Sequence, residues 1–177
     1  STDDGIERLR TVGKAAVLEH SVREQQLTGA TGIAHTRWAT HGAPTDANAH
    51  PHTDSRGRIA VVHNGIIENY RDLRAELEAE GREILSETDT ELIAHLIDVG
   101  VRAGEDLLIA VRTACARLRG SFAFAAICES APDTLVAAKN GGSPIILGVG
   151  DGETYLASDI PAILPYTRQM IFIEDGD

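Results

Sequence analysis

Three segments with a helical spacing of apolar residues lie together in the middle of this chain, and short strand-like runs lie on both sides of them. The helical segments are residues 70–80, 90–103 and 106–118, each followed closely by a glycine. The later strand-like runs are residues 121–128, 134–138, 145–148, 154–157 and 170–174, with turn residues such as Pro132-Asp133 between them. Because the helices do not alternate with the strands, the pattern predicts an α+β fold with mostly antiparallel sheets.

The first third of the chain has weaker signals. Asp3-Asp4-Gly5 is typical of a hairpin turn, and the patterns predict strands at residues 6–11 and 31–35 and a helix at residues 14–22. A loop rich in Pro, Asn, Asp and His is predicted at residues 42–56, before a buried strand at 58–63. Thr88 and Glu91 have the spacing of a capping box for the helix at 90–103.

Length and charge exclude several classes of protein. The chain has 177 residues, which fits one domain spanning residues 1–177, and its formal net charge is −11. This charge argues against a nucleic-acid partner and against an anionic membrane surface, and no apolar run has the length of a membrane span. The only cysteines, Cys115 and Cys128, lie in apolar patterns, which predicts buried thiols in a reducing, cytoplasmic compartment.

The polar run His-Thr-Arg-Trp-Ala-Thr-His-Gly at residues 35–42 is poorly suited to a core, because each polar atom would need a partner. It is well suited to holding a small zwitterion. Arg37 offers a planar fork for a carboxylate, Trp38 offers apolar cover, and Thr40 and His41 add hydrogen-bonding groups. The structural alternative is that Arg37 pairs with an acidic residue and that Trp38 belongs to the core.

Two further polar sites lie next to predicted elements, one just after a strand and one just before a helix. Asn64-Gly65 comes after a predicted strand, where a side-chain N–H and a glycine N–H can form an oxyanion hole. The alternative is a hairpin turn, for which Asn-Gly is a strong signal. Asp89 stands at the start of a predicted helix, where its carboxylate either binds an ammonium group or caps the helix.

A metal site is the competing interpretation of the histidines. Five of the seven lie in one third of the chain, at positions 35, 41, 50, 52 and 63. Their spacing fits no standard metal motif and no cysteine accompanies them. The sequence therefore predicts neither a metal nor a cofactor, and we expect His50-Pro51-His52 to shape the long loop.

These motifs together resemble the glutaminase domains of the isomerising glutamine–fructose-6-phosphate aminotransferases, which are class II glutamine amidotransferases. The resemblance covers nearly the whole chain and rests on residues 35–42, 48–52, 61–69 and 86–91, with later matches at 133–135, 142–144 and 157–159. It implies an N-terminal-nucleophile hydrolase fold, which is a four-layer αββα sandwich. It also implies that ammonia released from L-glutamine is used to make glucosamine 6-phosphate from fructose 6-phosphate.

The resemblance implies a role for each residue of the site. Arg37 would bind the α-carboxylate of glutamine and Asp89 its α-ammonium group, with Thr40 and His41 lining the pocket. Asn64 and Gly65 would form the oxyanion hole. Trp38 would gate the passage of ammonia.

The nucleophile of this family is an N-terminal cysteine, and no Cys-Gly-Ile strand stands at the start of this sequence. We therefore expect the chain as written to be inactive alone, as a domain without its first strand and nucleophile and without the sugar-isomerase domains. The full-length enzyme is expected to be a homodimer with no nucleic-acid or membrane partner. Two alternatives stay open: the glutaminase domain of an amidophosphoribosyltransferase, and a non-catalytic glutamine-sensing module.

Overall fold

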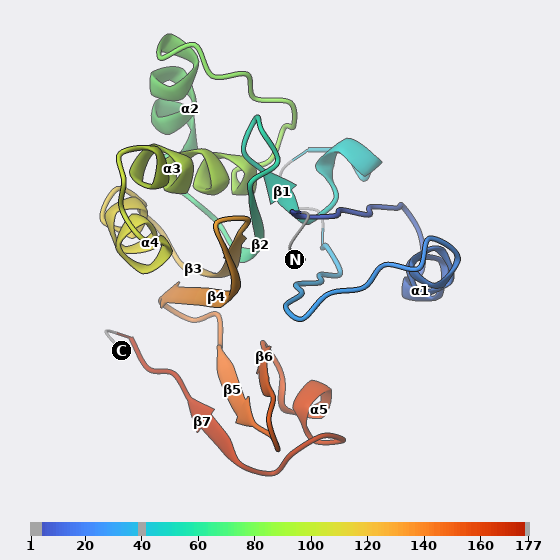
Figure 1. Ribbon diagram of the computed structural model, residues 1–177. Coiled ribbons are helices and arrows are strands. Elements are labelled where there is room, and N and C mark those ends of the chain that lie inside the picture. Colours follow the sequence, from blue (N-terminus) through green and yellow to red (C-terminus); the bar gives the residue numbers. More distant parts are fainter. Residues whose placement is uncertain (1–4, 39–41, 176–177) are drawn as a thin grey trace.

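The computed structural model describes residues 5–38 and 42–175. Its central element is strand β3 (Phe122–Cys128), in which every residue is buried. β3 pairs with β2 (Ile59–Gly65) and β4 (Ala131–Asn140), and β1 (His52–Thr53) completes an antiparallel sheet in the order β1-β2-β3-β4. A strand buried along its whole length needs cover on both faces of the sheet, and the two faces are covered differently (Figure 1).

Three helices cover one face of this sheet. They are α2 (Tyr70–Ala79), α3 (Thr90–Arg102) and α4 (Leu107–Cys115), and all three confirm the predicted helices. Since side chains alternate along a strand, Phe122, Phe124 and Ala126 of β3 share one face, and they join the apolar core beneath the helices. α3 is buried along most of its length because β1, β2, α2 and α4 all contact it. The first turn of α3 is thereby fixed against the sheet.

A second antiparallel sheet covers the other face. It contains β5 (Ile146–Val149), β6 (Thr154–Ala157) and β7 (Met170–Phe172) in the order β6-β5-β7. Ala123 and Ala125 of β3 share a cavity with Ile145 and Leu156, which lies between the two sheets.

The far side of the second sheet is covered by the short helix α5 (Ile160–Ile163). Ile163 of α5 is buried and lies against Gly148 of β5, on the face opposite to Ile145 and Leu147. The layers are therefore helices, sheet, sheet and helix, which agrees with the expected α+β, αββα class. No helix within the described residues is long and apolar enough to cross a bilayer.

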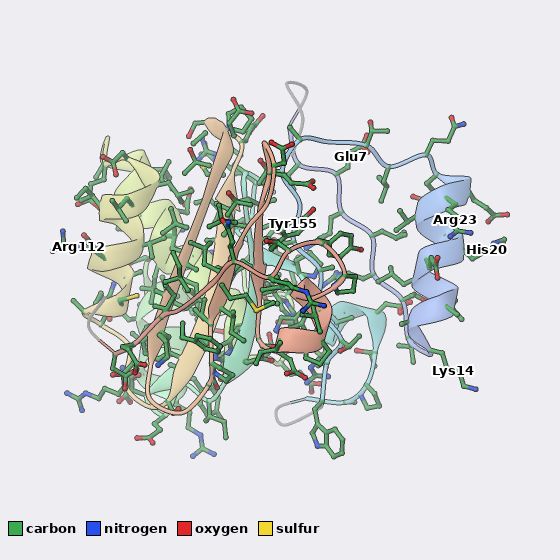
Figure 2. All side chains as sticks on the ribbon, turned by 90° about the horizontal axis from the view of Figure 1, so that it is seen from below. Glu7, Lys14, His20, Arg23, Arg112 and Tyr155 are labelled. Atoms are coloured by element: carbon green, nitrogen blue, oxygen red, sulfur yellow. The ribbon has the colours of Figure 1, made fainter. Side chains whose placement is uncertain are left out.

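The N-terminal third departs from the predictions. Helix α1 (Ala15–Glu24) forms as expected, but none of its residues is buried, and Lys14, His20 and Arg23 lie around its outer surface (Figure 2). The predicted strands at 6–11 and 31–35 are wrong, because neither segment has a ladder of backbone hydrogen bonds to another described segment. Asp3 and Asp4 of the predicted hairpin turn lie outside the described residues.

Two local predictions are also corrected. Pro132-Asp133 does not separate two strands: it lies inside β4, where the register with β3 shifts between Ile127 and Cys128. Such an irregularity accommodates a proline, which has no N–H for the ladder. The predicted loop at 42–56 includes a 3-10 turn (Asp46–Asn48) and strand β1.

Strand β2 ends at Asn64-Gly65, and the chain then runs toward α2. The neighbours of β2 in the sheet are β1 and β3, so the Asn-Gly pair is not a hairpin turn. Gly65 has a φ of +121°, and a Cβ there would overlap the carbonyl oxygen of Ser121 and lie 2.8 Å from the Cα of Phe122. Glycine is required at this position both by the backbone conformation and by the close approach of β3.

We expect Gly65→Ala to lower the free energy of unfolding by about 2–5 kcal/mol, since about 1–2 kcal/mol for the positive φ adds to about 1–3 kcal/mol of overpacking. Gly57→Ala is the matched control, because Gly57 also has a positive φ but a methyl group added there would meet no other atom within 4 Å. The control should lose only about 1–2 kcal/mol. Urea unfolding of both variants measures the difference, and equal losses would show that the approach of Ser121 is not limiting.

Candidate functional site

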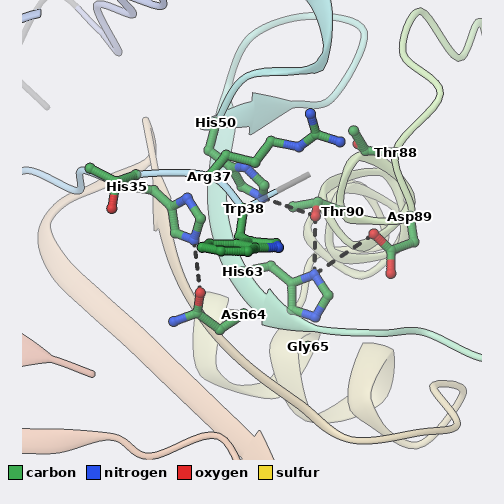
Figure 3. Close-up of a pocket in the computed structure, with 11 residues that line it drawn as sticks. His35, Arg37, Trp38, His50, His63, Asn64, Gly65, Thr88, Asp89 and Thr90 are labelled. Carbon is green, nitrogen blue, oxygen red and sulfur yellow. Dashed lines mark hydrogen bonds and ion pairs between the residues drawn. The ribbon is translucent and has the colours of Figure 1, made fainter. Parts of the chain in front are cut away.

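A pocket of about 160 Å³ brings together the three polar runs that the sequence singled out. They come from the extended segment before residue 39, from the end of β2 and from the start of α3 (Figure 3). The lining residues are His35, Thr36, Arg37, Trp38, His50, His63, Asn64, Gly65, Thr88, Asp89 and Thr90. Of the predicted site residues, Arg37, Trp38, Asn64, Gly65 and Asp89 therefore lie around one cavity, while Thr40 and His41 lie outside the described residues.

The side-chain amide of Asn64 is held by His35. Nε2 of His35 lies 2.9 Å from Oδ1 of Asn64, and both residues are partly buried at the edge of the pocket (Figure 3). With its oxygen engaged by His35, the amide has its NH2 group available as a donor. An N–H donor at the end of a strand, next to a glycine that lets the backbone approach closely, is a suitable group for stabilising a developing negative charge.

A threonine hydroxyl links two further histidines. Oγ1 of Thr90 lies 3.0 Å from Nε2 of His50 and 3.0 Å from Nδ1 of His63. The His50 ring in turn packs against the His35 ring, with 4.2 Å between the ring centroids. Burial lowers the pKa of His50 to about 2, with further lowering from His35, so His50 is a neutral hydrogen-bonding group at physiological pH.

Asp89 is buried and does not cap its helix. It precedes Thr90 at the start of α3, but its side chain makes no capping hydrogen bond. Instead, Oδ2 accepts a hydrogen bond from the backbone N–H of Ile67 at 2.8 Å, and Oδ1 lies 3.9 Å from Nδ1 of His63. The capping interpretation is therefore wrong, and the carboxylate joins the α3 start to the segment after β2.

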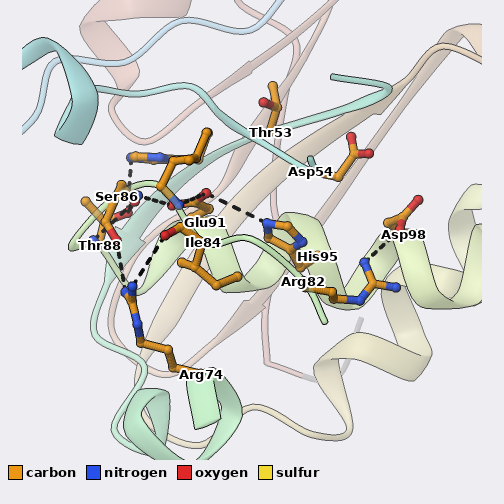
Figure 4. A network of polar contacts seen from close by, with 12 residues as sticks. Thr53, Asp54, Arg74, Arg82, Ile84, Ser86, Thr88, Glu91, His95 and Asp98 are labelled. Carbon is orange, nitrogen blue, oxygen red and sulfur yellow. Dashed lines mark hydrogen bonds and ion pairs between the residues drawn. The ribbon is translucent and has the colours of Figure 1, made fainter. Parts of the chain in front are cut away.

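The predicted capping box of Thr88 and Glu91 also does not form. The Glu91 carboxylate reaches back beyond Thr88 and accepts hydrogen bonds from the backbone N–H groups of Leu85 and Ser86 (Figure 4). Burial alone would raise the pKa of this carboxyl, but His95, Ser86 and Leu85 favour its charged form and lower the pKa to about 2. Glu91 thus anchors the loop that carries Thr88 and Asp89 into the pocket.

A second contact fixes the same loop. The Asn48 side chain is buried, donates to the carboxylate of Glu87 at 2.8 Å and accepts from the backbone N–H of Glu87 at 3.0 Å. Sequence reasoning missed the roles of Asn48, Glu91, His35 and Thr90. The one available signal was that His35, Thr90 and Glu91 lie inside the same polar runs as the predicted ligands, whereas Asn48 lies in the loop between two of these runs.

Arg37 and Trp38 lie at the rim of the pocket. The Arg37 guanidinium donates to the carbonyl oxygens of Gly42 and Ala43 at 3.2 and 3.3 Å, so it helps to shape its own loop. Trp38 is 90% exposed, which excludes the interpretation that it belongs to the core. A large apolar side chain beside a polar pocket is positioned to cover a bound ligand.

Neither cysteine lines the pocket. Cys128 is buried in β3 with its Sγ 3.2 Å from Oγ of Ser130, and burial raises the pKa of Cys115 to about 11. Both findings argue against a reactive thiolate at these positions. Within the described residues, no group of three or more His, Cys, Asp or Glu side chains is arranged to hold a metal ion.

Comparisons with known proteins find similar sequences over most of the chain. Residues 35–165 match the family described as the glutamine amidotransferase domain. A glutamine–fructose-6-phosphate aminotransferase [isomerizing] of Thermus thermophilus is 51% identical over 176 residues, which is 99% of this chain and 28% of the relative. The protein of the same description from Symbiobacterium thermophilum is 61% identical over 145 residues, which is 82% of this chain and 23% of that protein.

A solved structure is also similar. It is a glutamine phosphoribosylpyrophosphate amidotransferase from B. subtilis complexed with ADP and GMP, with a TM-score of 0.63 and 29% identity, covering 80% of this chain and 30% of that chain. The chain thus spans less than a third of the length of each of these relatives.

The buried histidines predict acid sensitivity. Burial lowers the pKa of His50 to about 2 and that of His52 to about 4, whereas an unfolded histidine titrates near 6.5. Between pH 6.5 and 5 the unfolded chain binds protons that the folded chain does not, so stability falls as pH falls. In this window, the contribution of each of the two histidines to the slope of the free energy of unfolding against pH should approach about 1.4 kcal/mol per pH unit.

Urea unfolding at several pH values measures this slope. His52→Gln should remove the contribution of one titrating proton from the slope, because glutamine does not titrate. The glutamine amide can replace the hydrogen bond between Nε2 and Thr88. His20→Gln on α1 is the matched control: the pair of His20 with Glu24 is exposed, so its loss should change the slope far less than His52→Gln does. An unaltered slope in His52→Gln would show that His52 is not the buried neutral group described here.

Proposed function

This chain belongs to the glutamine amidotransferase domain family, and we propose that its pocket binds L-glutamine and stabilises the oxyanion formed when the side-chain amide is attacked. The observation that carries the proposal is the Asn64 amide, whose oxygen is engaged by His35 at the edge of the pocket. Its NH2 group and the backbone N–H of Gly65 are the proposed donors to the oxyanion.

We assign the two charged groups on the α-carbon of glutamine to two side chains that line the pocket. Arg37 is proposed to bind the α-carboxylate through its planar fork, and Asp89 to bind the α-ammonium group. The position of Oδ1 of Asp89, at 3.9 Å from His63 and beyond hydrogen-bond distance, supports this assignment. The exposure of Trp38 supports its proposed role as a cover over the ligand and the ammonia passage. The resemblance adds Thr40 and His41 to the proposed lining.

The described lining offers no thiol, which supports a nucleophile that comes from outside this set of residues. The resemblance assigns this role to an N-terminal cysteine. Its thiolate would attack the amide carbon, the tetrahedral intermediate would release ammonia, and water would hydrolyse the thioester to glutamate.

For the full-length protein we propose the reaction named for its relatives, with fructose 6-phosphate as the acceptor of ammonia and glucosamine 6-phosphate as the product. A homodimer and a cytoplasmic location complete the proposal, and the two free thiols support a reducing compartment. The amidophosphoribosyltransferase alternative rests on the 29% identity to the solved structure, which is lower than the 51% identity to the aminotransferase. A glutamine sensor would bind glutamine without hydrolysing it.

Asn64→Ala in the full-length protein should lower the kcat for glutamate release by about 100- to 1000-fold and leave KM within about threefold, because an oxyanion donor acts on the transition state. Steady-state glutaminase assays measure both constants. A rise in KM with an unchanged kcat would contradict the oxyanion role and assign Asn64 to ground-state binding.

Asp89→Asn should weaken glutamine binding by about 10- to 100-fold, because an ammonium group would lose a charged partner in a site shielded from water. The asparagine oxygen can still accept the Ile67 N–H, so the melting temperature should change little. Titration calorimetry with glutamine and with glutaramate, which lacks the α-amino group, measures the effect. Equal weakening of both ligands would contradict the ammonium role.

A further inference from the structure

The Asn64 amide carries an NH2 group and a carbonyl oxygen, and only the NH2 group can stabilise an oxyanion. With NH2 toward the pocket the amide is a donor, whereas a rotation by half a turn would present the carbonyl oxygen, which repels a negative charge. Asparagine itself does not prefer either orientation strongly. The choice therefore depends on the group that contacts the amide from the other side, which is Nε2 of His35 at 2.9 Å.

The environment of His35 determines whether Nε2 carries the ring proton and donates it to the Asn64 amide. Burial lowers the pKa of His35, so the ring is neutral and carries a single proton. Nδ1 of His35 is buried and has no partner in hydrogen-bond geometry among the described residues, while the backbone of His63 lies near the ring and favours its charged form. A proton on Nδ1 would be a buried donor without an acceptor, which is more costly than an unused lone pair. The proton thus belongs on Nε2, where Oδ1 of Asn64 accepts it.

The ring of His35 is itself held in place. His50 packs against it at a centroid distance of 4.2 Å and an interplanar angle of 33°. Nε2 of His50 is hydrogen-bonded to Thr90, the first residue of α3, whose hydroxyl also contacts His63 of β2 (Figure 3). A side chain packed in this way keeps its hydrogen-bond direction, which is what a positioned donor requires.

We propose that His35 is the positioning residue of the oxyanion hole: its Nε2–H fixes the amide of Asn64 with the NH2 group toward the pocket. This inference rests on the proposed function of Asn64. His35 contacts no reacting atom and acts only through the amide. Without it the amide rotates, and a carbonyl oxygen faces the developing charge for part of the time.

A double-mutant cycle in the full-length protein tests the proposal. His35→Leu should lower the kcat for glutamate release by about 10- to 1000-fold with KM within about threefold. His35→Leu combined with Asn64→Ala should have the same kcat as Asn64→Ala alone, because a residue that acts through the amide has no effect once the amide is removed. A multiplicative loss in the double variant would overturn the proposal, and so would a His35→Leu effect confined to KM.

Two substitutions of His35 provide a matched pair. His35→Gln places an amide nitrogen near the position of Nε2 and should recover at least about a tenth of the wild-type kcat, whereas His35→Asn is too short and should resemble His35→Leu. Equal activities of His35→Gln and His35→Asn would overturn the proposal.

A measurement on the wild-type protein covers the case in which the variants do not fold. Proton–nitrogen correlation spectra of protein labelled with 15N-histidine show which ring nitrogen of His35 carries the proton. A proton on Nε2 supports the proposal and a proton on Nδ1 overturns it.

The kinetic variants distinguish the failure of this inference from the failure of the proposed function. If Asn64→Ala itself keeps its kcat, the proposed oxyanion role fails; if only His35→Leu keeps it, this inference alone fails.

Discussion

The hydroxyl of Thr90 is the point at which the sheet, the long loop and the helical layer are joined. It lies within 3.0 Å of a ring nitrogen of His50 in the loop and of His63 in β2, and it belongs to the first turn of α3. All three groups are largely shielded from water, where an unmade hydrogen bond is expensive. The residues on either side of Thr90 have hydrogen-bond partners of their own.

Those partners determine the shape of the pocket. Asp89 accepts the N–H of Ile67 and so fixes the chain just after Asn64-Gly65, while Glu91 accepts the N–H groups of Leu85 and Ser86 and fixes the loop before the helix. Three consecutive residues therefore bind three separate segments. A buried polar network of this kind tolerates little rearrangement, since each lost bond leaves a desolvated group behind. The rigidity of the proposed glutamine site follows from these contacts.

Much of this fold could be predicted from the sequence, and the failures have a common physical reason. Helices α2, α3 and α4 satisfy their own hydrogen bonds, so apolar spacing and a following glycine were sufficient to find them. A strand exists only when a neighbouring strand is present, and the segments 6–11 and 31–35 have the pattern without a strand ladder to any other part of the described chain. For the site, the motifs identified Arg37, Asn64 and Asp89, and the pocket gathers them. The supporting contacts of His35 and Thr90 join residues 27 to 40 positions apart, which local patterns do not report.

We propose that this pocket holds glutamine with its amide oxygen at Asn64, its α-carboxylate at Arg37 and its α-ammonium group at Asp89. A crystal structure of the full-length protein with L-glutamate, the product of hydrolysis, tests this claim most directly. We expect the α-carboxylate beside the Arg37 guanidinium, the ammonium group on Oδ1 of Asp89, and a side-chain carboxylate oxygen within hydrogen-bond distance of Nδ2 of Asn64. Glutamate bound in the reverse orientation, or at a place away from these three residues, would contradict it.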